Sequence, residues 1–251
     1  MSLRVDLLDS HFLLHGAPDL LAEIASLLPS PTTDVTDPGS DLDLDLGAND
    51  DLSDVLTLLN MTALAQCRSF AVHAGVVAGT DGAIALPAVS GAGKSTLVAA
   101  CVRAGLPYVS DEALVTDWDT GEVRAYPKWL SLSPWSAAHV GLEASIAEKA
   151  YPAALLGTVA EPTRLAHVVL PVRRPGPATL EPASRAAAAH RLLEMSFNHY
   201  QQPPRAFALV ADLLRGAQAW RLSYAEATEG AHLLAAHLGD GPDTTAARGT
   251  A

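Results

Sequence analysis

The chain has 251 residues, of which 49% are hydrophobic and 18% are charged, which is enough to bury the core of a globular domain and a small additional section. Its formal net charge of -12, without any run of lysine and arginine, argues against a nucleic-acid partner. No apolar window reaches the roughly 18 residues of a membrane span, and the first residues are too polar for a signal peptide. We therefore expect a soluble, cytoplasmic protein without a membrane partner. Cys67 and Cys101 are isolated and predicted to be buried thiols, as in a reducing compartment.

Residues 1–68 are predicted to form a small α/β section. Apolar residues recur at helical spacing in residues 18–28 and 52–64, whereas Asp and Leu alternate strictly in residues 41–46, as in a strand with one leucine face. The aspartates of this run raise the alternative of a calcium site. Alternate strand residues splay along a solvated face, however, and no EF-hand spacing follows, so the strand is the favoured interpretation.

Residues 69–239 are predicted to form the main domain, and residues 240–251 a disordered tail. Apolar runs and turn residues divide the domain into alternating strands and helices. The expected strands are residues 69–79, 82–88, 106–112, 113–118, 122–127 and 219–224, with a further strand that runs into a loop over residues 167–176, and the expected helices are residues 94–105, 184–200, 205–215 and 225–239.

A glycine-rich turn between a strand and a helix, "AVSGAGKST", predicts a phosphate-binding P-loop, because main-chain amides and the helix N-terminus converge on phosphate oxygens. Lys94 would neutralise the β- and γ-phosphates of ATP, and the Ser95 hydroxyl would bind Mg²⁺. Ala88 stands where the consensus has glycine, so the motif is a variant, and an ordinary glycine-rich turn is the alternative. The predicted nucleotide-binding residues are Ser90, Gly91, Ala92, Gly93, Lys94, Ser95 and Thr96.

An acidic pair, Asp111 and Glu112, ends the next predicted strand only 17 residues after Lys94. This distance is too short for the Walker B segment of a transporter-type ATPase, and no LSGGQ-like signature is present. A strand parallel to the one before the P-loop would end at the same edge of the sheet and bring both carboxylates to the γ-phosphate. There a carboxylate can accept a proton from a hydroxyl or hold Mg²⁺. The alternative is a solvated pair at a strand end.

Along the chain, His73 comes first, the predicted P-loop follows and the acidic pair comes last, within "HAGVVAGTDGAIALPAVSGAGKSTLVAACVRAGLPYVSDE". Over residues 69–130 this arrangement resembles the kinase domain of the HPr kinase/phosphorylase family. The resemblance implies an α/β P-loop kinase domain with a mixed, strand-rich sheet and flanking helices. It also implies protein-serine kinase activity, with Asp111 as catalytic base, Glu112 and Ser95 near Mg²⁺, and His73 beside the acid or the phosphate. By itself, His73 would more simply be a hydrogen-bonded strand histidine.

Three features depart from that family. Glu112 replaces the second aspartate, the downstream "E-[IV]-R-G-x-G" signature is missing, which speaks against the reverse phosphorolytic reaction, and the N-terminal section is short. The chain looks like the truncated relatives, some of which phosphorylate a serine of a ribosomal precursor peptide, including lasso peptides.

We therefore expect an ATP- and Mg²⁺-dependent kinase that acts on a serine of a peptide or small protein. A small-molecule kinase of an amino acid or sugar and a non-catalytic, nucleotide-responsive module are the alternatives, and the family's habit of assembly allows a homo-oligomer. Lys128, Arg173 and Arg174 are candidate substrate contacts, or else solvated loop charges. Residues 196–204 form either a binding loop or a helix end.

Overall fold

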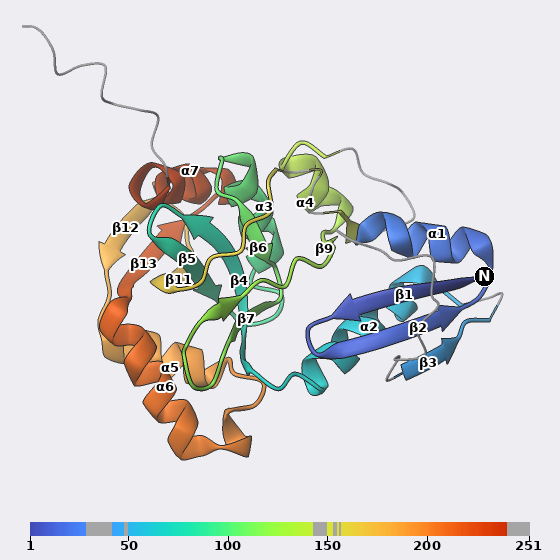
Figure 1. Cartoon of the computed structure of the whole chain (residues 1–251). Helices are drawn as coiled ribbons and strands as arrows, with labels where there is room; N and C mark the ends of the chain where they lie inside the picture. Colours follow the sequence, from blue (N-terminus) through green and yellow to red (C-terminus); the bar gives the residue numbers. More distant parts are fainter. Residues whose placement is uncertain (29–41, 48–49, 143–149, 153–154, 156, 240–251) are drawn as a thin grey trace, which may run out of the picture.

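The computed structural model describes residues 1–28, 42–47, 50–142, 150–152, 155 and 157–239 (Figure 1). It is a mixed α/β structure built on an eight-stranded mixed sheet. The predicted tail, residues 240–251, lies outside the described residues. Within the described part of the chain, no helix combines the length and apolar character needed to cross a membrane. Cys67 and Cys101 are buried free thiols, as expected.

The N-terminal section has a three-stranded sheet with the order β1-β2-β3 and two helices. Every second residue of β1 and β2 is buried, so this sheet has one covered face. The hairpin of β1 and β2 was not predicted, and its turn places Leu8, a non-glycine residue, at φ 56°. The elements are β1 (Ser2–Leu7), β2 (Ser10–His15), α1 (Pro18–Leu27), β3 (Leu42–Asp45) and α2 (Leu52–Ala65).

The large sheet has the strand order β12-β13-β11-β5-β4-β7-β8, and β6 pairs with β4 beside β7. In chain order, the first elements of the main domain are β4 (Phe70–Gly79), β5 (Gly82–Pro87), α3 (Lys94–Arg103), β6 (Tyr108–Ser110), β7 (Ala113–Thr116), β8 (Val123–Arg124), β9 (Leu130–Ser131) and α4 (Pro134–His139). The remaining elements are β10 (Ala150–Tyr151), β11 (Leu165–Arg173), β12 (Thr179–Pro182), α5 (Arg185–Glu194), the 3-10 turn η2 (His199–Gln201), α6 (Pro203–Gly216), β13 (Gln218–Tyr224) and α7 (Ala227–Leu238).

Helices cover both faces of the large sheet. α3 and α7 share one hydrophobic cluster with alternate residues of β5, such as Ile84 and Leu86. α5 and α6 cover the opposite face, where Ala83 and Ala85 of the same strand point (Figure 1). This alternation follows from the period of two in a strand, and it explains why β5 has no polar residue to present to water.

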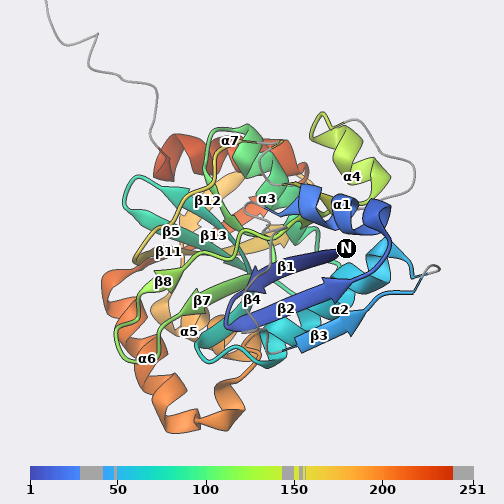
Figure 2. The ribbon, with the colours of Figure 1, turned by 45° about the vertical axis from the view of Figure 1, so that its right-hand side comes forward.

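The N-terminal section lies to one side of the large sheet (Figures 1 and 2). Its core continues into the main domain, because the cluster around α1 and α2 includes Val115, Tyr126 and Trp129. An ion pair joins the same parts, with Nη1 of Arg124 lying 3.0 Å from Oδ1 of Asp9. The N-terminal section is therefore packed against β7 and the segment that follows it.

The helix predicted for residues 184–200 ends early, since α5 stops at Glu194. The Ser196 hydroxyl accepts hydrogen bonds from the main-chain amides of Asn198 and His199, and such local bonds compete with helix formation. The main chain of this segment instead bonds to β4, where the amide of His73 donates to the carbonyl of Met195 over 2.8 Å. The prediction was wrong there because this pairing is non-local.

Candidate functional site

The predicted P-loop, residues 88–96, is an open turn that leads into α3. Gly91 and Gly93 have φ angles of 79° and 84°, a left-handed conformation that glycine adopts without strain. A Cβ atom at either position would meet nothing within 4 Å, so the turn is open on that side. α3 begins at Lys94 without a side-chain cap, which leaves its first-turn amides available to an anion. Phosphate groups therefore fit this turn.

The turn after β5 and the acidic pair after β6 lie close together because both strands are antiparallel to β4 and so run in the same direction. Their carboxyl ends lead into the P-loop and into Asp111 and Glu112, respectively, at one edge of the sheet. β6 and β7 pair along one side of β4, with Ser110 opposite Val76 and Ala113 opposite His73. The expected shared edge is thus present, although β4 separates the two strands.

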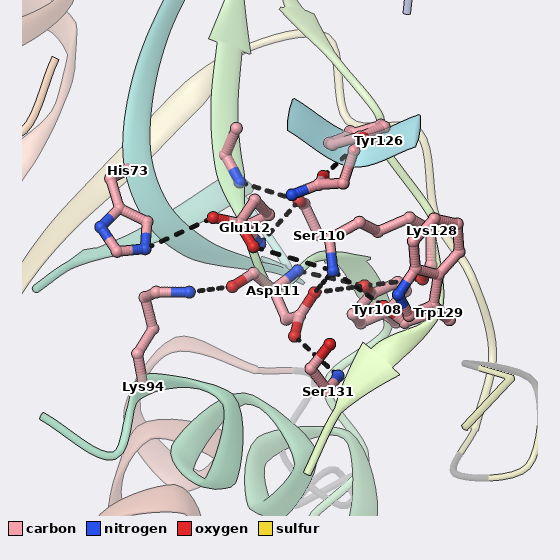
Figure 3. Close-up of polar contacts among 12 residues, drawn as sticks. His73, Lys94, Tyr108, Ser110, Asp111, Glu112, Tyr126, Lys128, Trp129 and Ser131 are labelled. Atoms are coloured by element: carbon pink, nitrogen blue, oxygen red, sulfur yellow. Dashed lines mark hydrogen bonds and ion pairs between the residues drawn. The ribbon is translucent and has the colours of Figure 1, made fainter. Parts of the chain in front are cut away.

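Lys94, the first residue of α3, points from the P-loop toward the acidic pair (Figure 3). Its ammonium group donates a hydrogen bond to the main-chain carbonyl of Asp111. Its side chain is buried, and burial lowers the pKa of Lys94, while the negative charge of Asp111 partly opposes this shift. A buried cation is stabilised by an anion that binds beside it.

Asp111 is buried, and its carboxylate is fully engaged. Oδ1 lies 2.9 Å from Nζ of Lys128 and accepts a hydrogen bond from the Tyr108 hydroxyl over 3.3 Å, while Oδ2 accepts one from the amide of Ser131 over 3.3 Å. Burial alone would raise the pKa of Asp111, but the charges of Lys128 and Lys94 outweigh it and lower the pKa below its ordinary value. The sequence analysis did not identify Tyr108 or Ser131, and no motif marks them.

Glu112 lies between this cluster and His73, and its two oxygens reach Lys128 and His73 (Figure 3). Its Oε1 lies 3.5 Å from Nε2 of His73, and its side chain is 25% exposed, whereas that of Asp111 is 1% exposed. Burial lowers the pKa of His73, and the nearby charge of Lys94 lowers it further. The charge of Glu112 opposes this shift in the pKa of His73, and the net lowering favours the neutral imidazole.

Lys128 is a buried residue rather than a solvated loop charge. Its ammonium group lies between the two carboxylates, 2.9 Å from Asp111 and 3.8 Å from Glu112, and it donates to the main-chain carbonyl of Trp129 over 3.0 Å. The Trp129 ring lies beneath the ammonium group, 5.3 Å from its centroid. Sequence reasoning selected Lys128 as a candidate contact, but the structure gives it this specific partner.

The two candidate arginines differ in position. Arg173 lines a small cavity of about 30 Å³ together with Gly93 and Thr96, so it lies beside the P-loop. Trp135 and His139 of α4 line the same cavity and stack on each other, with ring centroids 5.0 Å apart. Arg174 does not line this cavity; its amide donates to the carbonyl of Tyr224.

The first part of residues 196–204 is bonded to β4, since the Ser196 hydroxyl and the Phe197 amide both donate to the carbonyl of Ala71. The Asn198 side chain is buried, accepts from the amide of Ala71 over 3.2 Å and donates to the carbonyl of Ser69 over 2.8 Å. Tyr200 is 67% exposed and lies outside the contacts of the acidic pair. This geometry favours a structural role for Asn198 over a binding role.

A cavity of about 710 Å³ opens between α1, α2 and the acidic pair, and both Glu112 and Lys128 line it. Within the described ranges, no group of three or more His, Cys, Asp or Glu residues is arranged to hold a metal ion. A Mg²⁺ ion at a P-loop takes most of its ligands from phosphate and water, and so needs few protein ligands. The half-buried Ser95 hydroxyl and the partly exposed Glu112 are suited to that use.

Comparison with known proteins gives no match to the chain, either among protein-family models or among curated protein sequences.

Proposed function

We propose that this protein is an ATP- and Mg²⁺-dependent kinase of the HPr kinase type, which transfers the γ-phosphoryl group to a serine hydroxyl of a peptide or small protein. One observation carries the proposal: Lys94 extends from an open P-loop to the main chain of Asp111. A phosphate held by the turn would lie between the amides of α3 and the two carboxylates. This is the arrangement that phosphoryl transfer to a hydroxyl requires.

The chain's own residues have distinct roles in this proposal. The amides of residues 90–96 and Lys94 bind and orient the phosphates, and Arg173, which lines a small cavity with Gly93 and Thr96, would contact the bound substrates. Asp111 is the catalytic base, as the resemblance implies, while Lys128 and Tyr108 hold its carboxylate in position. Ser95 and Glu112 would hold Mg²⁺, whose charge neutralises the phosphate oxygens when it is bound.

One observation favours a second division of roles between the two acids. Glu112 lines the large cavity and contacts His73, whereas the Asp111 side chain is almost completely buried. In this version, Glu112 accepts the hydroxyl proton and passes it to neutral His73, and Asp111 is a positioning residue. Replacing each acid by its amide separates the two versions, because a base loses far more from this change than a positioning residue does.

The direct test is incubation of the protein with [γ-³²P]ATP, Mg²⁺ and a library of serine-containing peptides, followed by detection of labelled peptide. Phosphoserine in a peptide, absent with the Lys94→Ala variant, supports the proposal. Labelling of free serine or a sugar alone would assign a small-molecule kinase instead. ATP binding without any labelled acceptor would favour the nucleotide-responsive module.

A further inference from the structure

The large cavity joins the N-terminal section to the candidate reaction centre. α1 and α2 form one side, and Trp129, Ser131 and Ala150 lie on the other. Glu112, the more exposed member of the acidic pair, and Lys128 also line the cavity. At about 710 Å³, the cavity has room for several side chains of a bound molecule.

The charges that line this cavity are strongly unbalanced. Its acidic residues are Asp19, Glu23, Asp50, Asp51 and Glu112. Lys128 is the single cation among the described lining residues, and Asp111 already neutralises it. Asp19 and Glu23 lie one turn apart on α1, so they share a face, and neither forms an ion pair with another described residue.

The cavity also has an apolar floor. Leu52 and Leu56 of α2 are buried beneath it, and Trp129 forms part of the opposite wall. Met61, also on α2, is 60% exposed at its edge. A lining with an apolar floor and an acidic rim is complementary to an extended segment that carries both apolar and basic side chains.

We propose that this cavity binds the acceptor peptide and selects a serine that is flanked by apolar and basic residues. The inference rests on the proposed kinase function, because the serine of a peptide in this cavity would lie beside Glu112, which lines it. Asp19 and Glu23 are the specificity-determining residues, since both line the cavity and neither forms an ion pair with a residue that the structure describes. The N-terminal section is accordingly the part of the chain that recognises the acceptor.

Two fluorescein-labelled heptapeptides test this proposal. The first has one serine between two leucines, with two arginines at each end, and the second has glutamine in place of every arginine. Their affinities are measured by fluorescence anisotropy at low salt, where exposed charges are least screened. The double variant Asp19→Asn/Glu23→Gln removes the two charges. A matched double variant, Asp45→Asn/Asp54→Asn, removes two exposed charges of the same section that do not line the cavity.

The wild-type protein is expected to bind the arginine peptide roughly three- to tenfold more tightly than the glutamine peptide. The preference should decrease clearly in Asp19→Asn/Glu23→Gln, in which Asp50, Asp51 and Glu112 remain, and persist in full in the matched control. Equal affinity of the wild-type protein for both peptides, or the same loss in the control, would overturn the inference.

Phosphorylation of the same peptides with ATP separates this inference from the kinase proposal. If both peptides are phosphorylated with equal kcat/KM and bound equally, the kinase function stands and the cavity inference fails. If the arginine peptide binds selectively but neither peptide is phosphorylated, the kinase proposal fails while the cavity remains a site for cationic peptides.

Discussion

The ammonium group of Lys128 lies 2.9 Å from Oδ1 of Asp111, and both side chains are 1% exposed. Such a buried pair contributes little net stability compared with apolar residues of the same size, because each charge loses its water. Replacing only one member of the pair is strongly destabilising, since the remaining charge is then buried without a counter-charge. The pair therefore fixes the Asp111 carboxylate in place more than it stabilises the fold.

Replacing Lys128 should consequently reveal the cost of an unpaired buried carboxylate. We expect Lys128→Met to lower the free energy of unfolding by about 3–5 kcal/mol in urea denaturation. The double variant Lys128→Met/Asp111→Asn should regain a large part of this loss, because neither charge then remains. A double variant no more stable than Lys128→Met would show that the two groups are not coupled.

Replacing Lys94, unlike replacing Lys128, should not destabilise the fold. Burial lowers the pKa of Lys94, so at neutral pH its charged form is less favourable in the fold than in the unfolded chain. We expect Lys94→Met to lose ATP binding in calorimetry while its melting temperature stays the same or rises. Arg103→Met, at the exposed end of the same helix, should keep ATP binding. A clear fall in the melting temperature of Lys94→Met would contradict the argument.

The two acids can be separated by their amide variants. If Asp111 is the base, Asp111→Asn should still bind ATP but lower kcat about 10²- to 10⁴-fold. Glu112→Gln should then mainly raise the Mg²⁺ concentration needed for half-maximal activity. Measurement of kcat over a Mg²⁺ titration distinguishes the two effects. The reverse pattern would assign the base to Glu112.

The pH dependence of stability should report on His73. Because the folded-state pKa of His73 is lowered, the unfolded chain binds a proton in the pH range between that value and about 6.5, and the folded chain does not. Stability therefore falls as the pH decreases through this range. In His73→Gln, the decrease measured by urea denaturation should be smaller. His190→Gln, which removes an exposed histidine of α5, should leave it unchanged.

Gly75 of β4 allows α3 to approach the sheet. A Cβ atom at this position would lie 2.3 Å from Cγ2 of Val98 and 3.3 Å from Cγ of Lys94. We expect Gly75→Ala to destabilise the protein by about 1–3 kcal/mol and to weaken ATP binding, because the helix that carries Lys94 must move.

Gly216, at the end of α6, is the matched control for this substitution. A Cβ atom there would meet nothing within 4 Å, so Gly216→Ala should leave stability equal or slightly higher and ATP binding unchanged. Equal effects of the two substitutions on urea denaturation would argue against a special role for Gly75.

Much of the secondary structure follows from local patterns. The helices α1, α2 and α6 and the strands β3, β5 and β13 lie where periodicity predicts them, because each has an apolar face that its own sequence defines. The hairpin of β1 and β2 was missed, and the predicted helix after Ser184 was too long. Both errors concern segments whose hydrogen-bond partners could not be identified from the local sequence pattern.

The amino-acid sequence alone predicts the strand, turn and helix around residues 88–96, since left-handed glycines and an uncapped helix start are local properties of this segment. It also indicated that Asp111 would lie near this turn, through the direction of successive strands. Three features are visible only in the folded chain: Lys128 neutralises Asp111, Glu112 is the acid exposed to the cavity, and α1 and α2 line that cavity. They depend on tertiary contacts, which no local pattern specifies. The main domain brings Lys128 to Asp111, and packing of the N-terminal section against it brings α1 and α2 to the cavity.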